Sequence, residues 1–546
     1  MSRPTHAQAC QAFRWADSLA ALGWSAEGPV NLAETIVDRH AGRGRPALRW
    51  FGRDGSAVTL TYDELSARSS QFANLLRSLG VEPGDRVAGF LPRIPETLVT
   101  MLGTWKAGAI YVPIFTGFGP DGIAFRVADS GARVLCTQAA YRARVPDMRR
   151  PLHLITVGEA SAGDLEFASA LAAQPDRAPP VWRRRDDPAV LLYTSGSTGP
   201  PKGVKIAVNF VLAIHPYMRY AVDLQPDDVF WPTGDPGWGY GLVCYMVALA
   251  MGVPVISHEA PPAAEFVLDR LRDLGVTNLA TTPTLLRGVM ALGEAVVRGC
   301  PVRLRVASSC GEPLNPEVIT FFQRVWGITV MDQYGSSEFG LPIGNFNALA
   351  MPVKPGSMGL PLPGCRMAVV DDEGRELAPG AVGQIGLWPS ADGYYSLGYW
   401  QDEERTRGMW RGGWMTIGDL ARRDEDGYFW FEGRSDDVIK SAGYRIGPFE
   451  VESAILQHPD VAEAAVVGKP DALRGQIVKA YVVLRPGIPR RPGLDAEIVE
   501  LVKTRVGRHQ YPREVEFVEQ LPKTETGKIQ RFLLRQGERG ADREDA

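Results

Sequence analysis

A run of hydroxyl side chains and glycines between residues 194 and 202 has the composition of a phosphate-binding loop. It reads "TSGSTGPPK" and follows the apolar residues "LLY". Hydroxyls and free backbone amides can donate hydrogen bonds to phosphate oxygens, and Lys202 adds a positive charge. The spacing is not that of the common nucleoside-triphosphate loop, because Pro200 and Pro201 prevent the chain from entering a helix directly. Taken alone, the run also fits an ordinary solvated connection.

Three later stretches carry side chains suited to the other parts of a nucleotide. "DQYGSSEFG" follows a predicted strand and offers Tyr334, on which a base can stack, and Glu338, which can hold a metal ion. "GWMTIGDLARRDEDGYFWFEGR" contains Asp419, able to accept from both ribose hydroxyls, and Arg434, a permanently charged donor. "LPKTETGKIQR" places Lys528 on a polar loop. Singly, Glu338 and Lys528 are more typical of solvated surface side chains.

The elements that must position these side chains alternate between helices and short apolar strands. Residues 61–80 form a predicted helix whose start is a capping box of Thr61 and Glu64, and the strand 86–92 and helix 95–108 follow. Asn315 is expected to cap a later helix. The alternation predicts parallel sheets covered by helices.

The pattern changes twice towards the C-terminus. Residues 353–435 consist of glycine-rich short strands, including a hairpin with Asp-Gly at its turn in "DEDGYFWFEGR", which predicts a small β-barrel-like part. A compact α+β pattern of roughly 110 residues follows. We therefore predict an α/β protein with a large N-terminal domain over residues 1–434 and a small, mobile C-terminal domain over 435–546.

Bulk composition excludes several classes of protein. The 546 residues carry a net charge of −4, which gives no electrostatic basis for binding nucleic acid or an anionic membrane. Six cysteines without a C-x-x-C pair fit a reducing compartment. The apolar stretch 239–256 is interrupted by Gly252 and Pro254, so it predicts a buried helix, a glycine stop and a buried strand rather than a membrane span. With a polar N-terminus, these features lead us to expect a cytoplasmic protein.

Together, four motifs resemble the adenylate-forming superfamily, which includes acyl- and aryl-CoA synthetases, non-ribosomal adenylation domains and luciferases. They are "YTSGSTGPPKG", "YGSSE", "GDLARRDEDGYFWFEGRSDDVIKSAGYRI" and "PKTETGK", in the family's order and spacing, and the resemblance extends from about residue 30 to 535. The stretches "GRSDDVIKSAGYRIGPFEVESAIL" and "KPGSMGLPLPG" are most similar to medium-chain acyl-CoA and acetyl-CoA synthetases.

The resemblance implies a role for each matching residue. ATP and AMP would be bound by Thr194, Ser195, Gly196, Ser197, Thr198, Gly199, Lys202, Gly311, Glu312, Pro313, Asp332, Tyr334, Gly335, Ser336, Ser337, Asp419, Arg434 and Lys528. Glu338 would hold Mg²⁺, and Lys528, Glu338, Arg434 and Thr194 would be the catalytic residues. Asp436 would be the hinge of the small domain. Gly443, Tyr444 and Arg445 would border the passage for CoA.

The expected acid pocket departs from that of acetate-specific relatives. Those relatives carry a tryptophan where this chain has Gly335, so we expect the glycine to leave the pocket deep. Trp238 resembles an aromatic residue of the acid pocket or thiol tunnel, but simple core packing fits it equally well. "SSE" replaces the family's usual Gln-Thr-Glu, which leaves the role of Ser336 open.

The predicted function is an AMP-forming carboxylate–CoA ligase that uses ATP, Mg²⁺ and CoA and acts on a small-molecule carboxylic acid larger than acetate. Two alternatives keep the adenylation step: loading of a free-standing carrier protein, and a short-chain acetyl- or propionyl-CoA synthetase. A third hypothesis is a module that only senses ATP or AMP, although Glu338, Asp419, Arg434 and Lys528 are all present. The sequence leaves the oligomeric state open, with a homodimer as one option.

Overall fold

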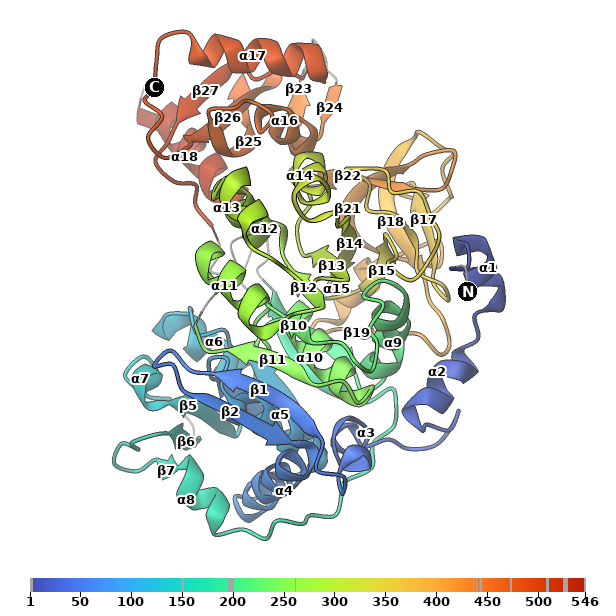
Figure 1. Cartoon of the computed structure of the whole chain (residues 1–546), viewed down its shortest axis with the longest axis vertical. Helices are drawn as coiled ribbons and strands as arrows, with labels where there is room; N and C mark the ends of the chain where they lie inside the picture. The colour runs from blue at the N-terminus through green and yellow to red at the C-terminus, as the bar shows by residue number, and fades with distance from the viewer. Residues whose placement is uncertain are drawn as a thin grey trace.

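The computed structural model describes residues 3–148, 152–194, 201–260, 262–435, 437, 439–441, 444–471, 474–506, 510–523 and 529–544. Within these residues the strands form four sheets. Figure 1 shows a large body that contains both long sheets and, at the top of the view, a small C-terminal part.

One long sheet holds the start of the chain together with a strand from far along it. Its order is β19 (Ser396–Tyr399), β9 (Lys202–Ala207), β8 (Pro188–Thr194), β4 (Ile110–Pro113), β3 (Arg86–Phe90), β5 (Val134–Gln138), β6 (His153–Val157) and β7 (Leu165–Glu166). Strands β8 to β7 pair in parallel, whereas β8, β9 and β19 pair antiparallel. A strand that arrives almost 190 residues later therefore closes this edge.

The other long sheet is parallel at its centre and antiparallel at both edges. Its order is β16 (Leu360–Pro361), β15 (Gly340–Gly344), β14 (Val330–Ser336), β13 (Val306–Cys310), β12 (Asn278–Thr281), β10 (Phe230–Pro232), β11 (Val255–His258), β1 (Pro46–Phe51) and β2 (Ala57–Thr61). The strands from β14 to β1 are parallel, so their carboxyl ends meet at one edge, where open α/β sheets bind ligands.

Helices α4 (Tyr62–Ser78) and α5 (Pro95–Lys106) begin as the sequence predicts. The Thr61 hydroxyl accepts from the backbone N–H of Glu64 while the Glu64 carboxylate accepts from that of Thr61, which confirms the capping box. Pro95 occupies the first turn of α5. Between these two helices Lys106 is only 1% exposed, and its ammonium donates to Asp38 at 2.8 Å and to the Ser70 hydroxyl at 3.0 Å.

The apolar stretch 239–256 forms the elements that its composition predicts. Helix α10 (Gly239–Ala250) is buried from Gly241 onwards, Gly252 adopts a left-handed conformation, and β11 follows. Among the described helices, none is long and apolar enough to cross a membrane.

The remaining strands make two small sheets. One is antiparallel, with β17 (Arg366–Val370), β18 (Val382–Trp388), β21 (Trp414–Arg423) and β20 (Trp410–Arg411) in order and β22 (Phe429–Arg434) paired to β21. The hairpin β21–β22 confirms the predicted Asp-Gly turn. The C-terminal sheet contains β24 (Tyr444–Ile446), β23 (Ile439–Ser441), β26 (Gly475–Leu484) and β25 (Val461–Asp471), with β27 (Glu514–Phe517) paired to β26.

The other helices cover these sheets, and the C-terminal part has a hydrophobic core of its own. They are α1 (His6–Ala12), α2 (Trp15–Leu22), α3 (Leu32–Ile36), α6 (Pro120–Ser130), α7 (Ala139–Arg142), α8 (Phe167–Ala172), α9 (Phe210–Tyr220), α11 (Ala264–Leu274), α12 (Pro283–Ala291), α13 (Glu294–Gly299), α14 (Pro316–Trp326), α15 (Glu403–Gly408), α16 (Pro448–Ile455), α17 (Leu494–Arg505) and α18 (Arg531–Glu544). The predicted fold class is confirmed: parallel sheets with helices, followed by a small C-terminal domain.

Candidate active site

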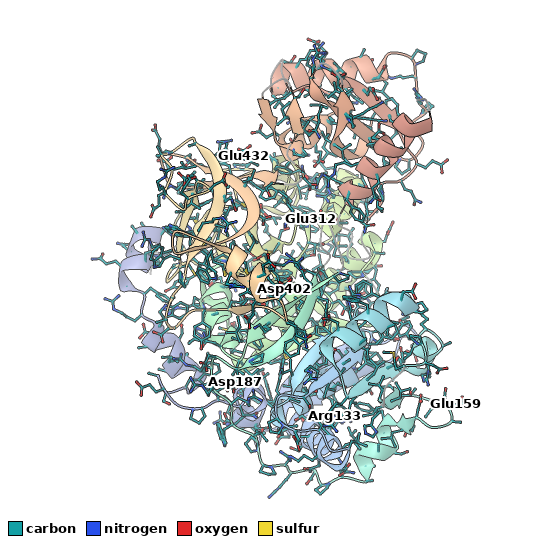
Figure 2. All side chains as sticks on the ribbon, turned by 180° about the vertical axis from the view of Figure 1, so that it is seen from behind. Arg133, Glu159, Asp187, Glu312, Asp402 and Glu432 are labelled. Atoms are coloured by element: carbon teal, nitrogen blue, oxygen red, sulfur yellow. The ribbon has the colours of Figure 1, made fainter. Side chains whose placement is uncertain are left out.

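A cavity of about 500 Å³ brings most of the predicted site residues together. It is lined by Thr194, Lys202, Trp238, Gly311, Glu312, Pro313, Asp332, Tyr334, Gly335, Ser336, Ser337, Glu338, Asp419 and Arg434. The C-terminal domain contributes Phe449, Glu452, Lys523, Ile529 and Arg531 to the same lining. Figure 2 shows Glu312 close to the junction of the two domains.

Some predicted residues cannot be placed in this way. Ser195, Gly196, Ser197, Thr198, Gly199, Asp436, Gly443 and Lys528 lie outside the described residues. Tyr444 and Arg445 belong to β24, but their side chains are also outside the description. The described residues on either side of Lys528, namely Lys523 and Ile529, both line the cavity.

Strand ends position the residues of the large domain. The antiparallel pair β8–β9 places Thr194 directly opposite Lys202, so both ends of the hydroxyl-rich segment start from the cavity wall. Gly311 follows β13 with φ of +106°, a conformation that side chains with a Cβ rarely adopt. Strand β14 ends at Ser336, whose hydroxyl accepts from the backbone N–H groups of Glu338 and Phe339. Ser336 therefore shapes the turn that presents Glu338.

A carboxylate, a guanidinium and a phenol form one group on the second wall. Asp419 on β21 is paired across the hairpin with Arg434 on β22, and their charged atoms are 3.2 Å apart. The Tyr334 hydroxyl donates to the other oxygen of Asp419 at 2.6 Å. Burial, with the Asp419 charge second, raises the pKa of Tyr334 well above its ordinary value, so the phenol stays protonated. This group fixes the Tyr334 ring at the cavity.

Two acids that line the cavity have pKa values shifted in opposite directions. Burial alone would raise the pKa of Glu312, but Arg287 at 2.8 Å and the backbone N–H of Thr284 at 2.9 Å hold it below its ordinary value. Burial raises the pKa of Asp332 well above its ordinary value. Within the described residues, Oδ1 of Asp332 is buried without a hydrogen-bond partner. Burial thus favours the neutral form of Asp332, and a neutral carboxyl can both donate and accept at the polar edge of a base.

Tyr399 joins two charged residues, Lys202 and Glu338, and sequence reasoning missed it. Lys202 donates to the Tyr399 hydroxyl at 2.9 Å, and that hydroxyl donates to Oε1 of Glu338 at 2.9 Å. Lys202 and Glu338 are 3.4 Å apart. Tyr399 lies on β19, which reaches this place by pairing with β9. A single tyrosine in a short strand carries no local signal of such a contact.

The donor set around Glu338 suits a cation that arrives with its substrate. In the part of the chain that the structure describes, no three His, Cys, Asp or Glu side chains are placed to hold a metal ion. Glu338 offers one carboxylate at the cavity, and Mg²⁺ is commonly held by one or two carboxylates plus substrate phosphates. The residues present therefore fit a Mg²⁺ bound mainly by ATP.

Gly335 borders the cavity, but the space beside it is occupied. A Cβ at this position would lie 2.3 Å from the carbonyl oxygen of Gly340 and 2.5 Å from Cδ2 of Leu341. The expectation that glycine leaves open space here needs correction, because Leu341 and the β15 backbone fill the direction in which a side chain would point. Trp238, immediately before α10, lines the same cavity.

The side chain of Asn315 does not cap α14, so the expectation of a helix cap at this residue was wrong. Asn315 is the residue before α14, but its side chain makes no capping hydrogen bond. Its amide donates to the Ser453 hydroxyl on α16 at 3.1 Å, and its oxygen accepts from Arg287 at 3.3 Å. In the first turn of the helix, the backbone N–H of Val318 donates to the Asn315 carbonyl at 3.1 Å instead, and Pro316 has no N–H to satisfy. Asn315 thus links the two domains beside the cavity.

The fold and this cavity define the class of protein: an α/β enzyme with its ligand site at the carboxyl ends of parallel strands, closed by a small C-terminal domain. The family described as "AMP-binding enzyme" matches residues 37–400, and "AMP-binding enzyme C-terminal domain" matches residues 450–528. The chain belongs to the AMP-binding enzyme family.

Individual relatives agree with the family. The acetyl-coenzyme A synthetase of Bacillus subtilis is 37% identical over 96% of this chain and 93% of its own length. The crystal structure of an acyl-CoA synthetase from Brucella canis is 40% identical, covers 99% of this chain and 100% of its own, and has a TM-score of 0.79. The crystal structure of an anthranilate CoA ligase in complex with anthranoyl-AMP is 29% identical, covers 97% of this chain and 100% of its own, and has a TM-score of 0.86. The chain is an AMP-forming acyl-CoA ligase that uses ATP and CoA.

Proposed function

We propose that this ligase activates a carboxylic acid larger than acetate as its acyl-adenylate and then transfers the acyl group to CoA. The observation that carries the proposal is the cavity itself, in which Lys202, Glu338, Asp419 and Arg434 come together although 232 residue positions separate the first from the last. The acyl-CoA synthetase and the anthranilate CoA ligase among the similar structures support the larger acid.

Each cavity residue has a proposed task in adenylation. Tyr334 stacks on the adenine, Asp332 and the 311–313 segment meet its edge, and Asp419 with Arg434 holds the ribose. Lys202, with residues 194–199, binds the β- and γ-phosphates. Glu338 would hold Mg²⁺, which offsets the negative charge of the phosphates. Lys528 approaches the acid carboxylate and the oxygen that bridges it to phosphorus.

The chemistry explains why cations and donors surround the site. A carboxylate oxygen attacks the α-phosphorus of ATP and pyrophosphate leaves, so two anions must be held together during the step. Fixed positive charges and hydrogen-bond donors offset that repulsion and stabilise the departing pyrophosphate. The acyl-adenylate is a mixed anhydride, and the sulfur of CoA attacks its carbonyl carbon while AMP leaves.

The second half of the reaction requires another arrangement of the domains. We propose the domain boundary at residues 434–435, with Asp436 as the hinge and with Gly443, Tyr444 and Arg445 beside the path of CoA. Lys523 and Ile529, the described residues on either side of Lys528, line the cavity, which supports the proposal that the orientation described here suits adenylation. Rotation of the small domain would exchange Lys528 for the segment around Gly443.

A short-chain acid is the second candidate, and one specific observation favours it. Leu341 and the Gly340 carbonyl occupy the space beside Gly335, so the glycine does not by itself make the acid pocket deeper. The acetyl-coenzyme A synthetase among the relatives agrees with this alternative. Each buried methylene of the acid contributes about 0.8 kcal/mol, so the two candidates predict different dependence on chain length.

A panel of acids decides between them. The purified protein is given ATP, Mg²⁺ and acetate, propionate, butyrate, hexanoate, octanoate, isobutyrate or benzoate, and ATP–pyrophosphate exchange is measured. The acyl-CoA product is then identified by mass. We expect kcat/KM to rise beyond propionate, and a maximum at acetate would favour the short-chain candidate. Comparing free CoA with a holo-carrier protein tests the acceptor, and absence of exchange with every acid would point to a nucleotide sensor.

A further inference from the structure

The buried hydroxyl of Tyr399 lies between the two charged groups that the proposed function assigns to ATP and its Mg²⁺. We infer that Tyr399 is a positioning residue that sets the orientation of the Glu338 carboxylate towards the metal and of Lys202 towards the phosphates. The inference rests on the proposed roles of those two residues and adds a third residue to the phosphate side of the site.

The backbone holds Tyr399 in this position from two sides. In the β9–β19 pair Tyr399 is opposite Val204, two residues beyond Lys202 on β9. The backbone N–H of Tyr399 donates to the Thr406 hydroxyl at 2.9 Å. The ring is 4% exposed, and the Lys202 ammonium lies 4.6 Å from its centroid. The hydroxyl therefore has a fixed location between Lys202 on β9 and Glu338 in the turn after β14.

The direction of each hydrogen bond decides what the hydroxyl can do. Its single proton is donated to Oε1 of Glu338, and its oxygen accepts from Lys202. Within the described residues, Oε2 of Glu338 accepts no hydrogen bond, and Glu338 lines the cavity. One carboxylate oxygen is thus anchored by Tyr399, and the other is left for a cation.

ATP binding requires Lys202 and Glu338 to exchange their contact with each other for contacts with the ligand. Lys202 and Glu338 neutralise each other at 3.4 Å, so both must exchange that contact for the phosphates and the metal. Without the tyrosine hydroxyl, the carboxylate could rotate onto the lysine with both oxygens, because Tyr399 makes the one hydrogen bond to Oε1 found among the described residues. With it, the two charges stay separated and aimed at their ligands. Tyr399 should therefore matter most when ATP and Mg²⁺ are bound together.

The test measures how strongly Mg²⁺ tightens ATP binding, without any turnover. The Kd of ATP is determined by equilibrium dialysis, without acid or CoA, in EDTA and at saturating Mg²⁺. The ratio of the two Kd values is the coupling between metal and nucleotide. We expect Tyr399→Phe to lower this ratio about tenfold or more, as expected for loss of a hydrogen bond to a charged group, and to change the Kd in EDTA by less than about threefold.

Two further variants make the result specific. In the Glu338→Gln protein the coupling should already be small, and adding Tyr399→Phe should lower it by less than about twofold. Tyr62→Phe is the matched control, because its hydroxyl is equally buried and donates to the carbonyl of Leu249 at 3.0 Å on α10 rather than to the cavity. That variant should retain the wild-type ratio.

Several outcomes would overturn the inference. They are a wild-type ratio near one, an unchanged ratio in Tyr399→Phe, and an equal loss of ATP affinity with and without Mg²⁺, which would indicate a purely structural role. If Tyr399→Phe does not fold, Tyr399→His, which keeps a ring N–H, is measured instead, and complete loss of coupling in that folded variant would contradict the donor role. Acid-dependent AMP formation by the wild type tests the proposed function separately, so the two can fail independently.

Discussion

Replacing Gly335 by alanine tests how the cavity is closed on the side of the acid. The added Cβ would lie 2.3 Å from the carbonyl oxygen of Gly340 and 2.5 Å from Leu341 Cδ2, whereas ordinary contacts start at 3.4 Å. The carbonyl cannot move easily, because Gly340 is paired with Ser336 in the β14–β15 ladder. One methyl group must therefore displace the strand end that leads to Glu338.

The expected cost is that of overpacking a rigid site, about 1–3 kcal/mol in the free energy of unfolding. Leu341 can yield but the carbonyl cannot, so combining Gly335→Ala with Leu341→Ala should not restore stability. Since the shift is passed to Ser336 and Glu338, the KM for ATP should rise for every acid in the panel. Urea unfolding measures the free energy of unfolding, and pyrophosphate exchange with several acids measures the KM for ATP.

A matched control separates the clash from the general cost of losing a glycine. Gly299 ends α13 with no atom within 4 Å of its Cβ position and no left-handed backbone, so Gly299→Ala should stay within about 1 kcal/mol of wild type. The reasoning would be refuted by a Gly335→Ala enzyme of normal stability whose only change is a preference for shorter acids. That result would mean that a side chain at 335 points into the acid pocket.

Three further predictions address other parts of the chain. Lys528→Ala should abolish acid-dependent pyrophosphate exchange but spare thioester formation from supplied acyl-adenylate, and equal loss of both would contradict its role. Asp38→Asn should destabilise the protein more than Lys106→Met, by about 3–5 against 1–3 kcal/mol in urea unfolding, because it leaves the buried ammonium without its counter-charge. Burial, with nearby Arg270 second, lowers the pKa of His258 from 6.5 to about 4. Folding thus favours neutral His258, so its contribution should lower stability by up to about 1.4 kcal/mol per pH unit as pH drops from 6.5 towards 4, and His258→Phe should reduce the measured slope by that amount.

Features that depend on neighbouring residues were predictable from the sequence. The capping box of Thr61 and Glu64, the alternation of helices and strands, and the Asp-Gly hairpin all follow from local chemistry, and the structure contains each of them. The stretch 239–256 could be assigned to a buried helix and strand because its glycine and proline interrupt it. These local signals were enough to predict the fold class.

Features that depend on contacts between residues far apart in the chain were not predictable from the sequence. Asn315 has the composition of a helix cap, yet Ser453 and Arg287 compete for its side chain across the domain junction. Gly335 suggested an empty space, but Leu341 reaches into it only because β15 folds back beside β14. Tyr399 meets Glu338 through the pairing of β9 with β19, and no pattern within either strand encodes that partner.

The late arrival of β19 also has a consequence during protein synthesis. Strand β9 ends at Ala207 and its edge partner begins at Ser396, so β9 is an open sheet edge on the growing chain until β19 has been made. At 5–20 residues per second, roughly 190 residues take about 10–40 s to translate. An unpaired edge can recruit strands of other chains. Nascent chains on the same mRNA should therefore be most prone to associate in this interval. Lys205, which is on β9, provides a charge that opposes such pairing.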